Sequence, residues 1–404
     1  MYISVTLQAF QSMDARRMEK SRMVHAPFQI QVAEDVLIDL KERLARARWP
    51  DSLPEAGWDY GTNLSYLRQL IDYWHESYDW RTQERLLNTF PQFTTEIDGI
   101  HLHFLHVRGK GMHPLPLLIS HGWPGSFFEM YKIIGPLTDP ESFGGDPADA
   151  FDVVVPSLPG YGFSGSTKVR GVTMARIAEV FVSCMQDLGY PRFATQGGDW
   201  GLHITRTLGR AWASKIVGIH LNIQPSRAVL SKEATNEAER RWLERRAQWM
   251  WEESGYSHMH ETRPQTLAYG LNDSPVGLAG WMVEKFRAWS DCHGEIESAF
   301  TKDELLTNVM IYWVTQTINA STRLYYETYH QHDDAFAGRA EVPTGVAVFL
   351  DDLPVPPRSL AQRLYNIQRW TEMKAGGHFA ALEQPQALVE DIRAFFRPLR
   401  KLVE

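Results

Sequence analysis

The sequence predicts an α/β fold in which helices flank a mostly parallel sheet, with a helical cap inserted into the sheet region and a helical arm before it. Three observations support this prediction. Short apolar runs, typical of strands buried in parallel sheets, alternate with helical patterns over residues 93–223. The alternation stops over residues 224–330, which are charged, aromatic and helical in pattern, and it resumes over residues 331–404. Residues 1–92, helical in pattern from residue 27, are expected to wrap the core.

Two amphipathic helices are expected in the arm, because apolar residues recur there at spacings of three and four. The apolar face of the first helix consists of Val36, Leu40, Leu44 and Ala47. That of the second helix consists of Leu67, Leu70, Ile71 and Trp74. Acidic residues stand in the first turn of the first helix and Pro50 follows its end, which is the usual arrangement at helix ends.

The predicted core begins with a hairpin, since Asp98-Gly99 between two alternating apolar segments is a strong signal for a two-residue turn. The expected hairpin strands cover residues 93–97 and 100–107. The expected buried strands cover residues 115–119, 153–155, 216–219 and 346–350. Helical patterns between and after them cover residues 174–188, 202–212 and 385–396.

Composition excludes several classes of protein. The chain has 404 residues and a net charge of −8 with both signs interspersed, so we expect no nucleic-acid partner. Its two cysteines, Cys184 and Cys292, make neither a disulfide framework nor a thiolate metal cluster, and they fit a reducing compartment. No apolar run reaches the roughly 18 residues of a membrane span, and the N-terminal segment lacks signal-peptide features. A soluble, cytoplasmic protein is expected.

The segment Gly197-Gly198-Asp199-Trp200-Gly201 lies between an apolar strand and a helix. This order is typical of a nucleophile elbow, although serine usually stands at its centre and a glycine-rich loop without function is the alternative. The segment His121-Gly122-Trp123-Pro124-Gly125 supports the first interpretation, because a loop after a buried strand commonly completes an oxyanion hole. The backbone N–H groups of Trp123 and Trp200 are the expected donors.

The chain also contains a candidate acid and a candidate base in the order expected for such a site. Asp352 follows the predicted strand 346–350, and His378 lies in Gly376-Gly377-His378-Phe379-Ala380 before the last helix. Nucleophile, acid and histidine in this order are typical of α/β hydrolases.

Several long segments together resemble the epoxide hydrolases of the microsomal type, here in a soluble form. The matching segments are residues 121–126, 197–201, 271–279, 303–309 and 376–381. The resemblance extends from about residue 27 to the C-terminus. It implies an α/β-hydrolase fold with a helical lid and an N-terminal meander, and neither a metal nor an organic cofactor.

The resemblance further implies conversion of an epoxide to a vicinal diol by way of a covalent ester on Asp199. A carboxylate suits this reaction because attack by serine would leave an ether, whereas the carbonyl carbon of an ester can be attacked by water. His378, oriented by Asp352, would activate that water. The adjacent Asp351 is the alternative to Asp352 as the orienting acid. We prefer Asp352, because residues 353–358 then match the corresponding segment of the family better.

Two lid tyrosines, Tyr256 and Tyr325, match the residues that donate a proton to the opening epoxide in this family. Neutral phenols suit this role because they donate hydrogen bonds without competing as nucleophiles. Tyr326 is a weaker candidate, since neighbouring residues on a helix point about 100° apart.

Two other functions remain open from the sequence. A haloalkane or haloacid dehalogenase would use the same aspartate, and a non-catalytic binding protein can share the fold. Closely spaced histidines such as His258 and His260 lack partners that would indicate a metal site. The expected partners are water and a bulky apolar or aromatic epoxide, with a homodimer left open. Detoxification, catabolism and tailoring of natural products are the roles that the resemblance allows.

Overall fold

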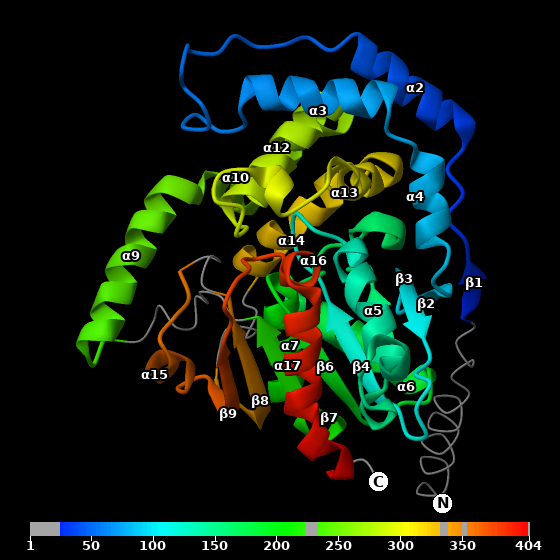
Figure 1. Cartoon of the computed structure of the whole chain (residues 1–404), viewed down its shortest axis with the longest axis vertical. Helices are drawn as coiled ribbons and strands as arrows, with labels where there is room; N and C mark the ends of the chain where they lie inside the picture. The colour runs from blue at the N-terminus through cyan, green and yellow to red at the C-terminus, as the bar shows by residue number, and fades with distance from the viewer. Residues whose placement is uncertain (1–24, 223–232, 332–337, 350–353, 403–404) are drawn as a thin grey trace, which may run out of the picture.

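The computed structural model describes residues 25–222, 233–331, 338–349 and 354–402. In these residues nine strands form one sheet in the order β1-β2-β3-β5-β4-β6-β7-β8-β9 (Figure 1). The strands are β1 (Ala26–Phe28), β2 (Gln92–Ile97), β3 (Ile100–Val107), β4 (Leu115–Ser120), β5 (Phe151–Pro156), β6 (Phe193–Gly197), β7 (Ile216–Asn222), β8 (Ala340–Val348) and β9 (Tyr365–Glu372). From β5 to β9 neighbouring strands are parallel, whereas β1, β2, β3 and β5 pair antiparallel. The predicted α/β-hydrolase fold is confirmed.

The predicted hairpin is confirmed at its turn. Ile97 pairs with Ile100, and the two residues between them have positive φ angles of 50° for Asp98 and 76° for Gly99. These angles are those of the primed turns, whose twist matches the twist of two antiparallel strands.

The centre of the sheet is the core of the molecule. All six residues of β4 and all six of β5 are buried, as expected for strands covered on both faces. The covering helices are α5 (Tyr131–Thr138), α6 (Met174–Asp187), α7 (Trp200–Ala211) and α17 (Pro385–Phe396). Helix α6 packs against α7, and α17 packs against α5, so the sheet lies between two helix pairs.

Several elements were not predicted, among them β1, β9 and the helix α4 (Trp80–Leu87). Strand β1 has only three residues, and β9 is polar along most of its length because it is the edge strand. Strand β8 begins at Ala340, before the predicted start at residue 346, since Glu341 and Pro343 interrupt the apolar pattern.

A group of lid helices follows β7 in the chain and, apart from α9, which stands to one side, lies over the carboxyl ends of the central strands (Figure 1). The lid helices are α9 (Glu237–Glu253), α10 (Gly255–Thr262), α11 (Pro264–Asp273), α12 (Pro275–Ala288), α13 (Lys302–Thr315) and α14 (Ile318–His330). Thr301 and Glu304 form a capping box that starts α13.

The arm helices, α2 (Glu34–Ala45), α3 (Leu64–Glu76) and α4, cover the outer surface of the lid (Figure 1). Arg43 on α2 donates to Asp273, with 2.8 Å to the backbone oxygen and 2.8 Å to Oδ1. The Thr62 hydroxyl donates to the backbone oxygen of Gly280 at 2.6 Å. The arm therefore stabilises the lid in its position over the sheet. Both predicted arm helices are present, although α2 ends before Ala47.

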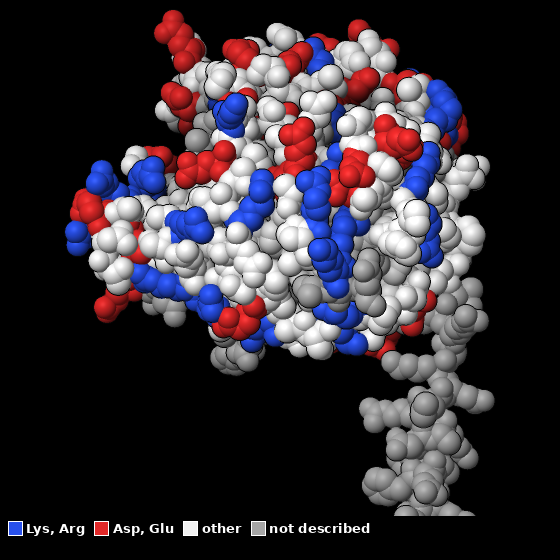
Figure 2. Space-filling model, turned by 60° about the horizontal axis from the view of Figure 1, so that its bottom comes forward, with Lys and Arg blue, Asp and Glu red and all other residues white. Residues whose placement is uncertain are grey.

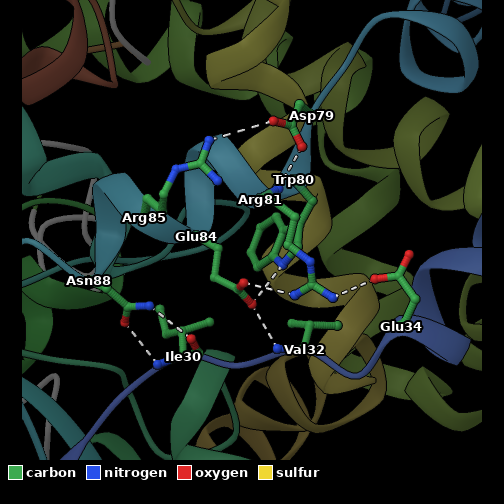
Figure 3. Close-up of polar contacts among 9 residues, drawn as sticks. All are labelled: Ile30, Val32, Glu34, Asp79, Trp80, Arg81, Glu84, Arg85 and Asn88. Carbon is green, nitrogen blue, oxygen red and sulfur yellow. Dashed lines mark hydrogen bonds and ion pairs between the residues drawn. The ribbon is translucent and has the colours of Figure 1, made fainter.

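The segment that leads into the arm is held by the side chains of Glu84 on α4 and of Asn88, which follows the end of α4 (Figure 3). Glu84 accepts hydrogen bonds from the backbone N–H of Val32 at 2.7 Å and from the indole N–H of Trp80 at 3.1 Å. Asn88 bonds the backbone of Ile30 in both directions, at 2.9 Å and 2.8 Å. These contacts replace the pairing that an extended segment would otherwise find in a sheet.

Replacing Glu84 with alanine is expected to lower the free energy of unfolding by about 1–3 kcal/mol, because buried N–H groups would lose their acceptor. Urea denaturation would measure the change. The matched control is Glu76→Ala, since Glu76 is exposed on α3. Equal midpoints for the two variants would contradict this role of Glu84.

Basic and acidic side chains lie among one another over the face shown in Figure 2. This mixture agrees with the interspersed charges of the sequence. Within the described residues, no helix is both long enough and apolar enough to cross a membrane.

Candidate active site

Asp199 lies at the sharp turn between β6 and α7, with φ 51° and ψ −128°. Such a backbone conformation is strained for a residue other than glycine. Glycines around it allow close approach: a Cβ on Gly201 would lie 2.0 Å from the backbone oxygen of Ser120, and one on Gly197 would lie 2.3 Å from that of Gly201. The geometry is that of a nucleophile elbow, which holds a side chain above the end of the sheet.

The loop after β4 supplies a donor to this carboxylate. The backbone N–H of Trp123 donates to Asp199 Oδ1 at 2.9 Å. Only glycine fits at position 122, where a Cβ would lie 2.1 Å from the same oxygen. Trp200 is the first residue of α7, and amides in the first turn of a helix have no partner within the helix. Both predicted oxyanion donors therefore lie beside Asp199.

His121 braces this loop. Its Nε2 accepts from the backbone N–H of Leu158 at 3.1 Å, and its Nδ1 lies 3.1 Å from the backbone oxygen of Gly122. Burial lowers the pKa of His121 to about 4, so the ring is neutral at pH 7. Because Nε2 accepts, Nδ1 carries the proton and donates to Gly122.

The lid helix α13 holds the same loop from the other side. The Asn308 side-chain amide donates to the backbone oxygen of Pro124 at 2.8 Å, and the Tyr312 hydroxyl donates to that of Gly125 at 2.6 Å. The Ser126 hydroxyl donates to Asn308 Oδ1 at 2.8 Å. All these atoms are buried, so the loop position depends on the lid.

His378 lies against the opposite oxygen of the carboxylate. Its Nε2 is 3.6 Å from Asp199 Oδ2, and its side chain is 3% exposed. The His378 backbone N–H donates to the backbone oxygen of Trp289 at 2.8 Å, and the two rings pack with centroids 4.9 Å apart. The structure therefore brings the predicted nucleophile and base together. Asp351 and Asp352, the candidates for the orienting acid, lie outside the described residues.

The two predicted lid tyrosines converge on this site. Tyr256 on α10 stacks on Trp123, with centroids 5.2 Å apart, and Tyr325 on α14 meets Trp200 edge to face at 4.6 Å. Burial raises the pKa of both phenols well above the usual value. The charge of Asp199 raises both pKa values further, and Tyr256 also raises the pKa of Tyr325. Both phenols are therefore protonated at neutral pH. Tyr326 is instead partly exposed and stacks on His330.

Two aromatic residues of the site were not assigned to it from the sequence, where His260 was noted only as one of two closely spaced histidines. Trp289 contacts His378 and also packs against Tyr256, with centroids 5.2 Å apart. His260, fully buried, lies 4.7 Å from Trp123 and 4.9 Å from Tyr325 between ring centroids. Burial lowers the pKa of His260 to about 3, so it is a neutral part of the wall. Neither residue belongs to a motif that could have identified it.

No three histidine, cysteine, aspartate or glutamate side chains gather as a metal site in the part of the chain that the structure describes. His260 Nε2 accepts from the indole of Trp281 at 3.1 Å.

Comparison with known proteins places this arrangement in context. The family model for the epoxide hydrolase N terminus matches residues 25–130, and the model for the alpha/beta hydrolase fold matches residues 116–252. Epoxide hydrolase 1 of Oryctolagus cuniculus is 36% identical over 91% of this chain and 88% of its own length. The epoxide hydrolase of Aspergillus niger has a TM-score of 0.83 and 31% identity, with 93% of this chain and 97% of that one covered. The juvenile hormone epoxide hydrolase of Bombyx mori has a TM-score of 0.84 and 31% identity, with 96% of this chain and 98% of that one covered.

Proposed function

The chain belongs to the epoxide hydrolase family, and from this premise we propose that Asp199 opens the epoxide as a nucleophile and forms a covalent ester. The observation that carries the proposal is the placement of this carboxylate. One of its oxygens accepts from the Trp123 amide, the other lies 3.6 Å from His378, and two buried phenols lie beside the amide-bearing tryptophans.

In the first step, Asp199 Oδ2 attacks a ring carbon, because Oδ1 is held by the Trp123 amide. The carbon–oxygen bond of the ring breaks, and the oxygen leaves as an alkoxide that needs a proton. Tyr256 and Tyr325 are protonated at neutral pH and share this role as donors. Their hydrogen bonds strengthen as negative charge develops, so they favour the transition state over the bound substrate.

In the second step, His378 Nε2 takes a proton from water as the water attacks the carboxyl carbon of Asp199. The charge that develops on Oδ1 is stabilised by the backbone N–H groups of Trp123 and Trp200. The ester bond breaks, and the diol leaves with the proton from His378. The carboxylic acid left on Asp199 then gives up its proton, which restores the phenol that protonated the alkoxide, and the carboxylate is regenerated. Asp352, or Asp351 in its place, is proposed to orient the histidine.

The walls of the site favour an apolar or aromatic epoxide. Trp123, Trp200, Trp289 and the neutral ring of His260 surround the two phenols. Aromatic walls bind apolar groups by burial and by ring stacking. A dehalogenase would need donors for a halide at this place, and the protonated phenol pair favours an epoxide oxygen instead.

Cys184 and Cys292 are buried free thiols, which fits the cytoplasm as the compartment. A homodimer is the proposed assembly. Sedimentation of the purified protein, which measures the mass of the assembly, would test it.

Single turnover in water enriched in heavy oxygen tests the ester mechanism. The first diol released is expected to lack the heavy isotope, because its new oxygen comes from Asp199. The label should appear in the enzyme and in the diol of later turnovers, as mass spectrometry of both would show. A heavy oxygen in most of the first diol would mean that water attacks the epoxide directly.

A further inference from the structure

A small cavity lies beside Asp199, at the carboxyl ends of the central strands. Its volume is about 20 Å³, which is room for one water molecule. Its polar lining consists of Ser120, His121, Glu129, Gln196, Asp199, Asn222 and His378. Both ring nitrogens of His121 already have partners in the loop. Neither Tyr256 nor Tyr325 lines it. A molecule in the cavity would therefore not compete with the epoxide oxygen for the two phenols.

Two of the lining groups are buried polar atoms that need a partner. Ser120 is 0% exposed and Gln196 is 1% exposed. Ser120 Oγ and Gln196 Oε1 have no hydrogen-bond partner among the described residues, while Gln196 Nε2 donates to Asn222 Oδ1 at 3.2 Å. Buried polar atoms of this kind are usually satisfied by an ordered water, which needs two to four polar neighbours.

Glu129 contributes a third polar group from the short helix η1 (Phe127–Met130). Its carboxyl group lies over Gly125, where an added Cβ would be 1.4 Å from Glu129 Oε1. Burial raises the pKa of Glu129 to about 8, with His378 opposing and Asp199 adding to the rise. The side chain is therefore a neutral acid at pH 7, able both to donate and to accept a hydrogen bond.

The role of Glu129 differs from that of a structural acid nearby. Glu304 is also buried, but Lys132 pairs with it at 2.5 Å, and it closes the capping box of α13. No lysine or arginine pairs with Glu129 in the described part of the chain. The sequence contained one sign of this residue, because Ser126 and Glu129 have the spacing of a capping box. The Glu129 carboxyl group interacts with the backbone N–H of Ser126, as in such a box, and it also lines the cavity.

We propose that this cavity holds the water that hydrolyses the ester, and that Glu129 is a positioning residue that directs this water toward the carboxyl carbon of Asp199. The inference rests on the proposed function. The water oxygen bonds to the carboxyl carbon, and His378 takes the proton. The bond from that carbon to the alkyl oxygen then breaks, and the proton passes from His378 to the departing diol. Glu129 keeps its own proton throughout.

Transient kinetics of three variants test the proposal, with the rates of ester formation and of ester hydrolysis measured separately by rapid quench and intact mass. Glu129→Leu is expected to form the ester at the normal rate and to hydrolyse it about 100-fold more slowly, because a misplaced reactant costs about that factor. Glu129→Gln should retain most of the hydrolysis rate, since an amide is also neutral and bonds in both directions. Ser120→Ala should slow hydrolysis by up to about 10-fold, the effect of one lost hydrogen bond.

Normal hydrolysis in Glu129→Leu would overturn the role of Glu129, as would an equal loss in Glu129→Gln and Glu129→Leu. If Glu129→Leu does not fold, Ser120→Ala decides, because unchanged hydrolysis there would refute a water in the cavity. A slower ester formation in these variants would also contradict the proposal. Absence of any ester in the wild-type enzyme would instead refute the proposed function, so the two failures can be told apart.

Discussion

The variant His378→Gln is expected to stop at the covalent ester and to accumulate it. In the proposed mechanism, formation of the ester needs Asp199 and the lid phenols. Hydrolysis needs a base at the position of His378 Nε2, which lies 3.6 Å from Asp199 Oδ2. General-base catalysis contributes about 10²–10⁴ in rate, so hydrolysis should fall by about that factor while ester formation persists. Intact mass spectrometry after mixing with excess epoxide should show one added substrate mass.

The control for this experiment is Asp199→Ala, which should show neither the added mass nor turnover, because it lacks the nucleophile. An unmodified His378→Gln protein at saturating epoxide would contradict the division of labour between Asp199 and His378. The same measurement assigns the orienting acid. Of Asp351→Asn and Asp352→Asn, we expect the second to accumulate the ester, because Asp352 is the predicted partner of His378.

The double variant Tyr256→Phe/Tyr325→Phe is expected to lose nearly all ester formation. In the proposed mechanism each phenol donates to the leaving oxygen, and losing one such donor costs about 10²–10³ in rate. With both lost, the alkoxide has no acid beside it. Hydrolysis of an ester already present should change little, because Trp123 and Trp200 stabilise that step through their backbone N–H groups.

Stopped-flow fluorescence can follow this prediction without a label. Tyr256 stacks on Trp123 and Tyr325 contacts Trp200, so events at the phenols lie next to two fluorophores. Tyr326→Phe is the matched control, since Tyr326 is the neighbour of Tyr325 on α14 and is partly exposed. An undiminished rate of ester formation in the double variant would refute the role of the phenols and would favour a dehalogenase.

Much of the fold could be predicted because its rules are local. Buried strands such as β4 are apolar throughout, and the hairpin needs two residues that accept positive φ, which Asp98 and Gly99 supply. The elbow was visible for the same reason, because Gly197 and Gly201 stand where any side chain would collide with the backbone. Edge strands escaped prediction, since β9 is solvated and has no strong apolar pattern.

The sequence by itself was enough to predict the candidate nucleophile, the candidate base and the loop donors, because each lies in a short segment whose backbone geometry requires glycine or a strand end beside it. Only the tertiary structure decided which lid residues surround them. Trp289 and His260 reach the site because the lid helices pack over the ends of the strands. Glu129 and Ser120 share one cavity because core elements that are separate in the chain meet there. Contacts of this kind join residues from separate elements. They are determined by side-chain packing between those elements, and such packing leaves no periodic signal in the sequence.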